Sequence, residues 1–409
     1  MSWPVRPLGE VADTALGKML DKGRSRGLPH VPYLRNVNVQ WGRIDTDNLL
    51  TMELDDAERE RFGVEPGDLL VCEGGEIGRC AIWQGRSDYI AYQKALHRVR
   101  PSDALDTKFL RYLLEQYASN GILSRLSTGS TIAHLPQQQL RRIPVPLPAI
   151  DEQRRIVAIL EDHLSRLDAA IASIHASLRR LEVLRRLVVK ELAIGARIPL
   201  KQLAVDAGYG TSVKCEIGGP GPAVVRIPNL VGGRIDLSDE KRAADPSVDL
   251  ASAMLAPGDV LVVRTNGSKD LIGRSGVVQE GVNATFASYL IRYRVDTARV
   301  RPEWIHVMLA SPSLRAEIER LAASSAGQHN LSLGKLDGLL IPTPSLQDQD
   351  AGLARLAEFD DQAGALRKVL EESVRRGENL GRSLLAAAFS GRLTGSAPDM
   401  SEAEEMIGA

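Results

Sequence analysis

The motifs that would give this chain a reaction of its own are missing from its sequence. The nearest approach to a nucleotide-binding P-loop begins at Gly267, but its next glycine, Gly273, comes one position late, and Arg274 replaces the lysine that would hold phosphates. No Gly-x-Gly-x-x-Gly follows a predicted strand, and neither a Gly-x-Ser-x-Gly elbow nor the Asn-Pro-Pro-(Tyr/Phe) signature of adenine methyltransferases occurs. We therefore predict that this chain has no catalytic residue and that catalysis belongs to partner proteins.

Composition and cysteine spacing narrow the class further. Cys72, Cys80 and Cys215 show no C-x-x-C spacing, which argues against a metal site and against a disulfide framework. The 409 residues are 44% hydrophobic and 25% charged, as expected for two or three globular domains. No apolar run of about 18 residues and no signal peptide occur, so we expect a cytoplasmic protein. A net charge of −1 permits a nucleic-acid partner without favouring one.

One long helix is predicted between Pro148 and Gly195. About 45 residues in this stretch contain neither proline nor glycine. Their apolar side chains alternate in steps of three and four, the heptad seam of a coiled coil: Val157, Leu160, Leu164, Leu167, Ile171, Ile174, Leu178 and Leu181. At about 1.5 Å per residue the helix is a rod of roughly 65 Å, which needs a partner rod. The alternative is a long amphipathic core helix.

A second rod repeats the first. Residues 345–349 resemble 149–153 at an offset of 196, and Gly391 closes the second segment as Gly195 closes the first. The second seam is interrupted by Gly364, Gly377 and Gly381, each of which costs a helix up to about 1 kcal/mol. We still predict a helix, because packing against the first rod can outweigh propensity.

The segments before the rods also repeat one another. Arg35 and Asn38 recur 191 residues later as Arg226 and Asn229, and the Pro-Gly-Asp turn at 66–68 recurs at 257–259. In the first segment we expect strands at 69–72, 80–83 and 89–100, and a helix over 107–121, which together make an α+β domain. We predict two similar globular domains alternating with two long helices that pair as an antiparallel, pseudo-twofold coiled coil. The predicted divisions are residues 1–147, 148–196, 197–343, 344–395 and an acidic, disordered tail at 396–409.

This order of elements resembles the specificity subunit of Type I DNA restriction-modification systems. The residues that carry the resemblance are the Pro146-x-Pro148 step with the Glu152-Gln153 pair, the Pro-Gly-Asp turns, and the loops 128–135 and 326–331 before each rod. It implies that each globule is a target recognition domain reading one half of a bipartite, gapped DNA sequence. It also implies that the helices set the gap and dock two methyltransferase subunits and, in the full complex, restriction subunits. No cofactor or metal is expected in this chain; S-adenosylmethionine is expected in the methyltransferase partner, and ATP and magnesium in the restriction partner.

Candidate site residues follow from what such a domain must touch. Arginine, lysine, asparagine and glutamine can make forked contacts to base edges, whereas serine and threonine suit phosphates. The candidates for DNA binding are Arg35, Asn38, Lys94, Ser130, Thr131, His134, Arg226, Asn229, Asn266, Lys269, Gln328, His329 and Asn330. The candidates for partner binding are Glu152, Gln153, Arg154, Asp348 and Gln349. The competing hypothesis is a coiled-coil scaffold whose globules bind protein or other non-DNA ligands, with a weaker dependence of affinity on salt.

Overall fold

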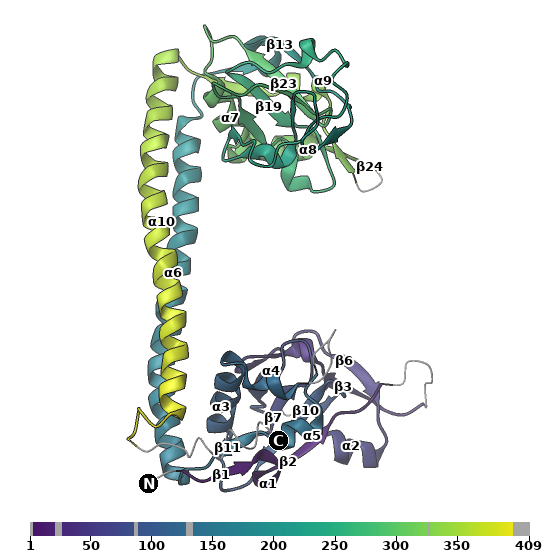
Figure 1. Ribbon diagram of the computed structural model, residues 1–409, viewed down its shortest axis with the longest axis vertical. Helices are drawn as coiled ribbons and strands as arrows, with labels where there is room; N and C mark the ends of the chain where they lie inside the picture. Colours follow the sequence, from purple (N-terminus) through teal and green to yellow (C-terminus); the bar gives the residue numbers. More distant parts are fainter. Residues whose placement is uncertain (1–2, 21–26, 86–88, 128–133, 326–327, 396–409) are drawn as a thin grey trace. The chain divides into compact units, whose positions relative to one another are not determined.

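The two long helices connect two compact units (Figure 1). The computed structural model describes residues 3–20, 27–85, 89–127, 134–325 and 328–395, so the predicted acidic tail at 396–409 lies outside the described residues. Unit 1 comprises Met1–Ile174 and Glu371–Ala409, and unit 2 comprises His175–Leu370. Each unit therefore contains one globule and a part of both long helices.

Both predicted rods are continuous helices. Helix α6 (Ile150–Leu192) has 43 residues and α10 (Leu346–Phe389) has 44. In unit 1 the first half of α6 lies beside the last half of α10, and in unit 2 the last part of α6 lies beside the start of α10. The helices therefore pack antiparallel, as the sequence predicts (Figure 1). None of the described helices is long and apolar enough to cross a membrane.

Unit 1 is built on an antiparallel sheet with the order β2-β10-β7-β8, beside a second sheet with the order β6-β3-β9. Its strands are β1 (Val5–Pro7), β2 (Ala12–Leu16), β3 (His30–Leu34), β4 (Val39–Gln40), β5 (Arg43–Ile44), β6 (Leu50–Glu53), β7 (Leu69–Cys72), β8 (Cys80–Ile82), β9 (Ala91–Tyr92), β10 (Leu96–Pro101) and β11 (Pro144–Pro146). Its short helices are α1 (Leu8–Val11), η1 (Asn36–Asn38), α2 (Asp56–Phe62), α3 (Thr107–Ser119), α4 (Ile122–Leu126) and α5 (Gln137–Arg141). The strand predicted over 89–100 is divided by a turn between β9 and β10.

Unit 2 repeats this plan with a longer sheet of order β13-β23-β19-β21-β17-β16. Its strands are β12 (Ala196–Pro199), β13 (Ala204–Tyr209), β14 (Cys215–Glu216), β15 (Ala223–Val225), β16 (Leu230–Val231), β17 (Arg234–Ile235), β18 (Arg242–Ala243), β19 (Asp259–Val263), β20 (Thr265–Asn266), β21 (Ser275–Val277), β22 (Ala284–Phe286), β23 (Leu290–Val295), β24 (Ala323–Ser325), β25 (Gln328–Asn330) and β26 (Leu340–Thr343). Its short helices are η2 (Leu200–Leu203), η3 (Ile227–Asn229), η4 (Ala251–Ala253), η5 (Lys269–Leu271), α7 (Pro302–Leu309), α8 (Pro312–Leu321) and α9 (Leu333–Asp337).

The repeated Pro-Gly-Asp turn explains why both globules fold alike. In unit 1 the buried Asp68 carboxylate accepts from the Glu65 amide at 2.8 Å and from Arg100 Nε and Nη2 at 2.6 and 2.9 Å. In unit 2 Asp259 and Arg294 form the same bidentate pair, at 2.8 and 2.9 Å. Hydrogen bonding to the carboxylate raises the pKa of both arginines. The turn before the central strand is therefore held identically in both halves.

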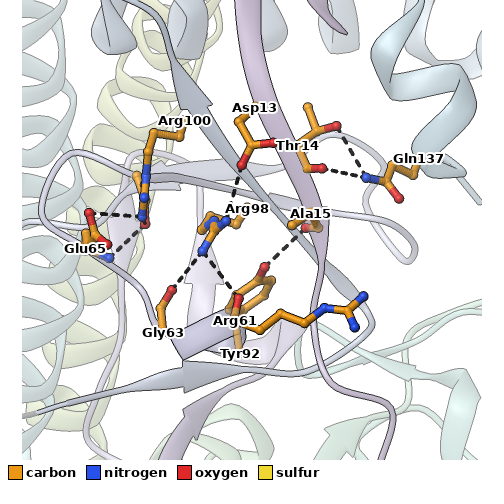
Figure 2. A network of polar contacts seen from close by, with 11 residues as sticks. Asp13, Thr14, Ala15, Arg61, Gly63, Glu65, Tyr92, Arg98, Arg100 and Gln137 are labelled. Carbon is orange, nitrogen blue, oxygen red and sulfur yellow. Dashed lines mark hydrogen bonds and ion pairs between the residues drawn. The ribbon is translucent and has the colours of Figure 1, made fainter. Parts of the chain in front are cut away.

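Arg98, two residues before Arg100 on β10, fastens the neighbouring elements of unit 1. Figure 2 shows its guanidinium group reaching the Gly63 carbonyl oxygen at 3.2 Å and the Asp13 carboxylate at 3.3 Å. Strand β2 and the end of α2 are thereby joined to β10. The same view shows Gln137 donating to the Thr14 carbonyl oxygen at 2.6 Å, which connects α5 to the other side of β2.

Candidate nucleic-acid interface

The most regular feature of both globules is an asparagine-centred turn. Asn38 Oδ1 accepts from the Arg35 amide at 3.0 Å, and its Nδ2 donates to the Asp45 carbonyl oxygen at 3.0 Å. Asn229 makes the same two contacts in unit 2, at 2.9 Å each. Both side chains are buried, with 3% and 2% exposed. Asn38 and Asn229 are candidates for DNA binding, and in the structure the oxygen and nitrogen atoms of both amides hold a turn closed inside the protein.

The two arginines that precede these turns are only half-buried. Arg35 Nη2 donates to the Asn48 carbonyl oxygen at 2.8 Å. Arg226 Nη2 donates to both the carbonyl and carboxylate oxygens of Asp239, at 2.6 and 3.0 Å. Each guanidinium group therefore supports its own loop on one side. Fewer of the guanidinium N–H donors therefore remain for a ligand than the sequence suggested.

In unit 2 the predicted residues meet at a small sheet of order β20-β25-β24. Asn266 pairs with His329, and Thr265 pairs with Asn330, in the antiparallel register of β20 and β25. Lys269 is exposed in η5, directly after this strand pair. The backbone of Gln328 pairs with Ser325 on β24. The sequence candidates at both ends of this loop system therefore lie together.

Arg264, which sequence reasoning missed, lies at the centre of this group. Its Nη2 donates to Asn330 Oδ1 at 3.1 Å, and its guanidinium group lies over the Tyr209 ring, 4.6 Å from the centroid. Its Nη1 donates to the Ser288 carbonyl oxygen at 3.3 Å, and its buried Nε has no hydrogen-bond partner. A signal was available, because Arg264 directly follows the apolar run of β19 and so leaves the sheet beside a loop.

Unit 1 builds the same scaffold around a different side chain. The Leu331 amide donates to the Arg264 carbonyl oxygen at 2.8 Å, and the Leu135 amide donates to the Glu73 carbonyl oxygen at 2.7 Å. The Arg264 amide donates to a carbonyl oxygen in the turn before β23, and the Glu73 amide donates to one in the turn before β10. Both distances are 3.0 Å. Glu73 and Arg264 are therefore equivalent positions, 191 residues apart, with opposite charge.

The unit 1 candidates gather around Glu73. His134 is exposed and its backbone forms a bridge with Gly74, whose carbonyl oxygen accepts from Asn36 Nδ2 at 3.1 Å. Lys94 is exposed in the turn between β9 and β10, next to the Ala95 carbonyl oxygen to which the Glu73 amide donates. Asn36 was not among the predicted residues. Ser130 and Thr131 lie outside the described residues.

The two glutamines predicted to bind partners, Gln153 and Gln349, form hydrogen bonds inside the protein. Gln153 Oε1 accepts from the Asp106 amide, and its Nε2 donates to the carbonyl oxygens of Ala104 and Pro148, all at 2.8 Å. Its side chain is fully buried, as is that of Gln349, so neither presents a surface to another protein. Both side chains instead hold the start of a long helix to its globule, a junction that we call the joint of that unit.

Gln349 holds the corresponding joint of unit 2. It accepts from the Arg301 amide at 2.8 Å and donates to the Arg299 and Pro344 carbonyl oxygens at 3.2 and 2.9 Å. The remaining partner candidates lie nearer the surface. Arg154 and Asp348 are exposed, and Glu152 is half-buried.

Two of the three cysteines are buried, and the described ranges contain no cluster of metal-ligating side chains. No group of three or more histidine, cysteine, aspartate or glutamate residues there could hold a metal ion. Burial raises the pKa of Cys72 to about 11 and raises that of Cys80 as well, so neither thiol is a nucleophile at neutral pH.

Comparison with known proteins adds the family to this geometry. Residues 2–180 match the family model described as the Type I restriction modification DNA specificity domain. The EcoKI specificity subunit of Escherichia coli strain K12 is 22% identical over 96% of this chain and 89% of its own length. The StySPI specificity subunit of Salmonella potsdam is also 22% identical, with the same coverage. Residues 2–180 therefore carry a Type I restriction modification DNA specificity domain, and most of the chain is similar to specificity subunits.

Solved structures share the fold of this chain. A chain from a study of complex assembly and conformational transition in a type I restriction-modification system aligns with a TM-score of 0.73 at 18% identity, covering 95% of this chain and 97% of that one. The HsdS subunit of Thermoanaerobacter tengcongensis aligns with a TM-score of 0.55 over the same shares, also at 18% identity.

The names of these matches indicate a general role. The family model over residues 2–180 is a DNA specificity domain, and both relatives are named specificity subunits of Type I restriction enzymes. Specificity subunits are not catalytic and need no cofactor of their own, because the catalytic activities lie in partner subunits.

Proposed function

We propose that each globule reads one half of a bipartite, gapped DNA target. The observation that carries this proposal is the pair of equivalent positions occupied by Glu73 and Arg264. A shared backbone scaffold supports side chains of opposite charge at the centre of each loop group. Two modules that recognised the same ligand would have no reason to differ there, whereas two readers of different bases would.

The chemistry of each loop group suits base edges. In unit 2, Arg264, Asn266 and Asn330 are of the residue types that contact guanine and adenine in the major groove. Lys269 and His329 lie beside them. In unit 1 a carboxylate at Glu73 suits the amino group of cytosine, and Lys94 and His134 flank it. Arg35 and Arg226, which are partly engaged in their own loops, are better suited to hold the DNA backbone.

The helix pair sets the gap between the two half-sites. We assign the docking of two methyltransferase subunits to the starts of α6 and α10, near Glu152, Arg154 and Asp348. Restriction subunits join the full complex. S-adenosylmethionine belongs to the methyltransferase partners, ATP and magnesium belong to the restriction partners, and the complex acts on DNA in the cytoplasm.

Exchange of one globule tests this proposal. Residues 1–147 are replaced by the corresponding segment of another specificity subunit, and methylated positions are mapped by sequencing DNA from cells with and without the hybrid complex. One half of the recognised sequence is expected to change while the other half and the gap stay the same. A change in both halves would contradict independent reading, and the absence of any sequence preference would contradict the proposed function.

A further inference from the structure

A hollow of about 920 Å³ lies within unit 2, between the last turns of α6 and the globule. We call it the arginine hollow. The lining residues that carry charge into it include Arg185, Arg186, Arg274, Arg315, Asp270 and Asp360. Helix α6, the β16-β17 turn, η5 and α8 all contribute to its walls. The hollow therefore combines basic side chains from α6 and from the globule.

Two of the four arginines are already neutralised. Arg185 forms a bidentate pair with Asp360, with Nε-Oδ1 at 2.7 Å and Nη2-Oδ2 at 3.0 Å. Arg315 donates to the Ile272 carbonyl oxygen and lies 3.6 Å from the Glu319 carboxylate, so it holds η5 against α8. These two side chains shape the walls.

Arg186 and Arg274 are different. Both side chains are exposed, and neither guanidinium group has a hydrogen-bond or ion-pair partner within the part of the chain that the structure describes. Asp270 is the acidic residue of the lining that has no arginine pairing with its carboxylate among the described contacts. The hollow thus keeps a surplus of positive charge for an anionic ligand.

Comparison with unit 1 shows that this charge is particular to unit 2. Arg79 is equivalent to Arg274, but it donates to Glu76 at 3.2 Å and to the Asn36 carbonyl oxygen at 3.0 Å. At the position of Glu76, unit 2 has Leu271, which cannot neutralise an arginine. The smaller hollow at this place in unit 1, about 430 Å³, has Glu76 and Glu115 as its charged lining residues. The same site is basic in one unit and acidic in the other.

The arginine hollow adjoins the candidate reading loop. Asp270 and Leu271 line the hollow, while Asn266 and Lys269 belong to the same short segment, in which Asn266 pairs with His329 of the loop group around Arg264. We propose that Arg186 and Arg274 bind a backbone phosphate of the DNA beside the half-site read by unit 2. This rests on the proposed function and deepens it. Such a contact fixes position and strengthens binding without selecting a base.

The test measures the dependence of affinity on salt. The full chain, assembled with its partner subunits, is titrated with a duplex carrying its target and with one in which the half read by unit 2 is scrambled. In the R186A/R274A variant, the slope of log K against log[salt] is expected to become shallower by about 0.9, because that is the contribution of one lost phosphate contact. Affinity for both duplexes should fall by a similar factor, so that their ratio is preserved.

Two control variants separate charge in the hollow from charge in general. R320A removes an exposed arginine of α8 that does not line the hollow and should leave the slope unchanged. R274K keeps the charge and should retain most of the slope. Since neither the Arg186 nor the Arg274 guanidinium group has an internal partner among the described residues, the thermal unfolding of R186A/R274A should match the wild type, which excludes misfolding.

Other outcomes would overturn the proposal. An unchanged slope in R186A/R274A would mean that no phosphate occupies the hollow. Loss of a partner subunit from the complex, with the slope for DNA unchanged, would mean that an acidic protein segment occupies it. A wild-type complex without sequence preference would remove the proposed function, yet a slope change on scrambled DNA would still report phosphate binding by the hollow.

Discussion

Gly352 of α10 lies against the indole ring of Trp304 on α7. A Cβ atom at Gly352 would come within 3.0 Å of Trp304 Cζ3 and within 3.0 Å of Leu192 Cδ2. In unit 1 the equivalent positions are Ile156 and Phe109, both fully buried. The joint between globule and helix is therefore filled differently in the two units. Unit 2 pairs a large ring with glycine, and unit 1 pairs a smaller ring with isoleucine.

We predict that G352A lowers the free energy of unfolding although alanine favours helices. Overpacking typically costs about 1 to 3 kcal/mol, more than the gain of up to about 1 kcal/mol from replacing a helical glycine. G364A is the matched variant, since nothing lies within 4 Å of its added Cβ, and it should raise stability. Urea unfolding of both variants checks the pair. Stabilisation by both would show that the joint of unit 2 has spare room.

The buried Gln153 joint is expected to be essential for unit 1. In Q153A the Asp106 amide and the Ala104 and Pro148 carbonyl oxygens lose their partners, at about 1 to 3 kcal/mol for each group left unsatisfied. Hydrogen exchange should then rise in the segment before α3 and at the start of α6. Q347A, at an exposed position of α10, is the control and should exchange like the wild type. Equal exchange in both variants would contradict the fastening role.

The stability of unit 1 should fall in mild acid because of His97. Burial lowers the pKa of this ring, whose Nε2 donates to the Leu135 carbonyl oxygen at 2.8 Å. The native state keeps the ring neutral while the unfolded chain takes up a proton below about pH 6.5, so the free energy of unfolding decreases as pH drops through that value.

Unfolding midpoints at several pH values test this. In H97L the ring is gone, so stability should be lower at pH 7.5 because the Leu135 carbonyl oxygen has lost its donor, but the fall toward pH 5.5 should be smaller. A remaining slope is expected from His306, whose pKa burial also lowers. H163Q, at an exposed position of α6, should behave as the wild type does. If the stability of H97L falls toward pH 5.5 as much as that of the wild type, groups other than His97 cause the fall.

Arg264 should govern one position of the half-site read by unit 2. R264K keeps the charge but loses the planar fork, and we expect discrimination at one base pair to weaken by about 1 to 3 kcal/mol, or roughly 5- to 150-fold. Binding to a library of target variants measures this, and preferences in the half read by unit 1 are the internal control. Weakening spread evenly over all positions would show that Arg264 contacts the backbone.

The long helices could be predicted from the sequence because their pattern is local. A stretch without proline and glycine and with heptad spacing has few alternatives. The glycines of the second helix were harder to interpret. Gly377 and Gly381 lie where Ile171 and Leu164 approach from α6, with side-chain atoms 3.2 and 3.6 Å from an added Cβ. Their contribution is close packing between helices, which only the partner helix reveals.

The site was less predictable, for a physical reason. Residues that recur in both halves, such as Asn38 with Asn229 and Gln153 with Gln349, were read as candidates for binding. They recur because both globules need the same turns and joints. Glu73 and Arg264 differ on an identical backbone, and difference at a shared position indicates recognition better than identity does. The backbone equivalence of these two positions emerges only from the hydrogen bonds of the folded chain.

Gln153 and Gln349 form hydrogen bonds with main-chain atoms of the globule, so these bonds do not depend on which side chains the globule carries. Any incoming segment whose backbone follows the same path before its first long helix would be accepted. Recombination between related genes at these joints could therefore generate new pairings of readers in a single event, without later adjustment of the connection.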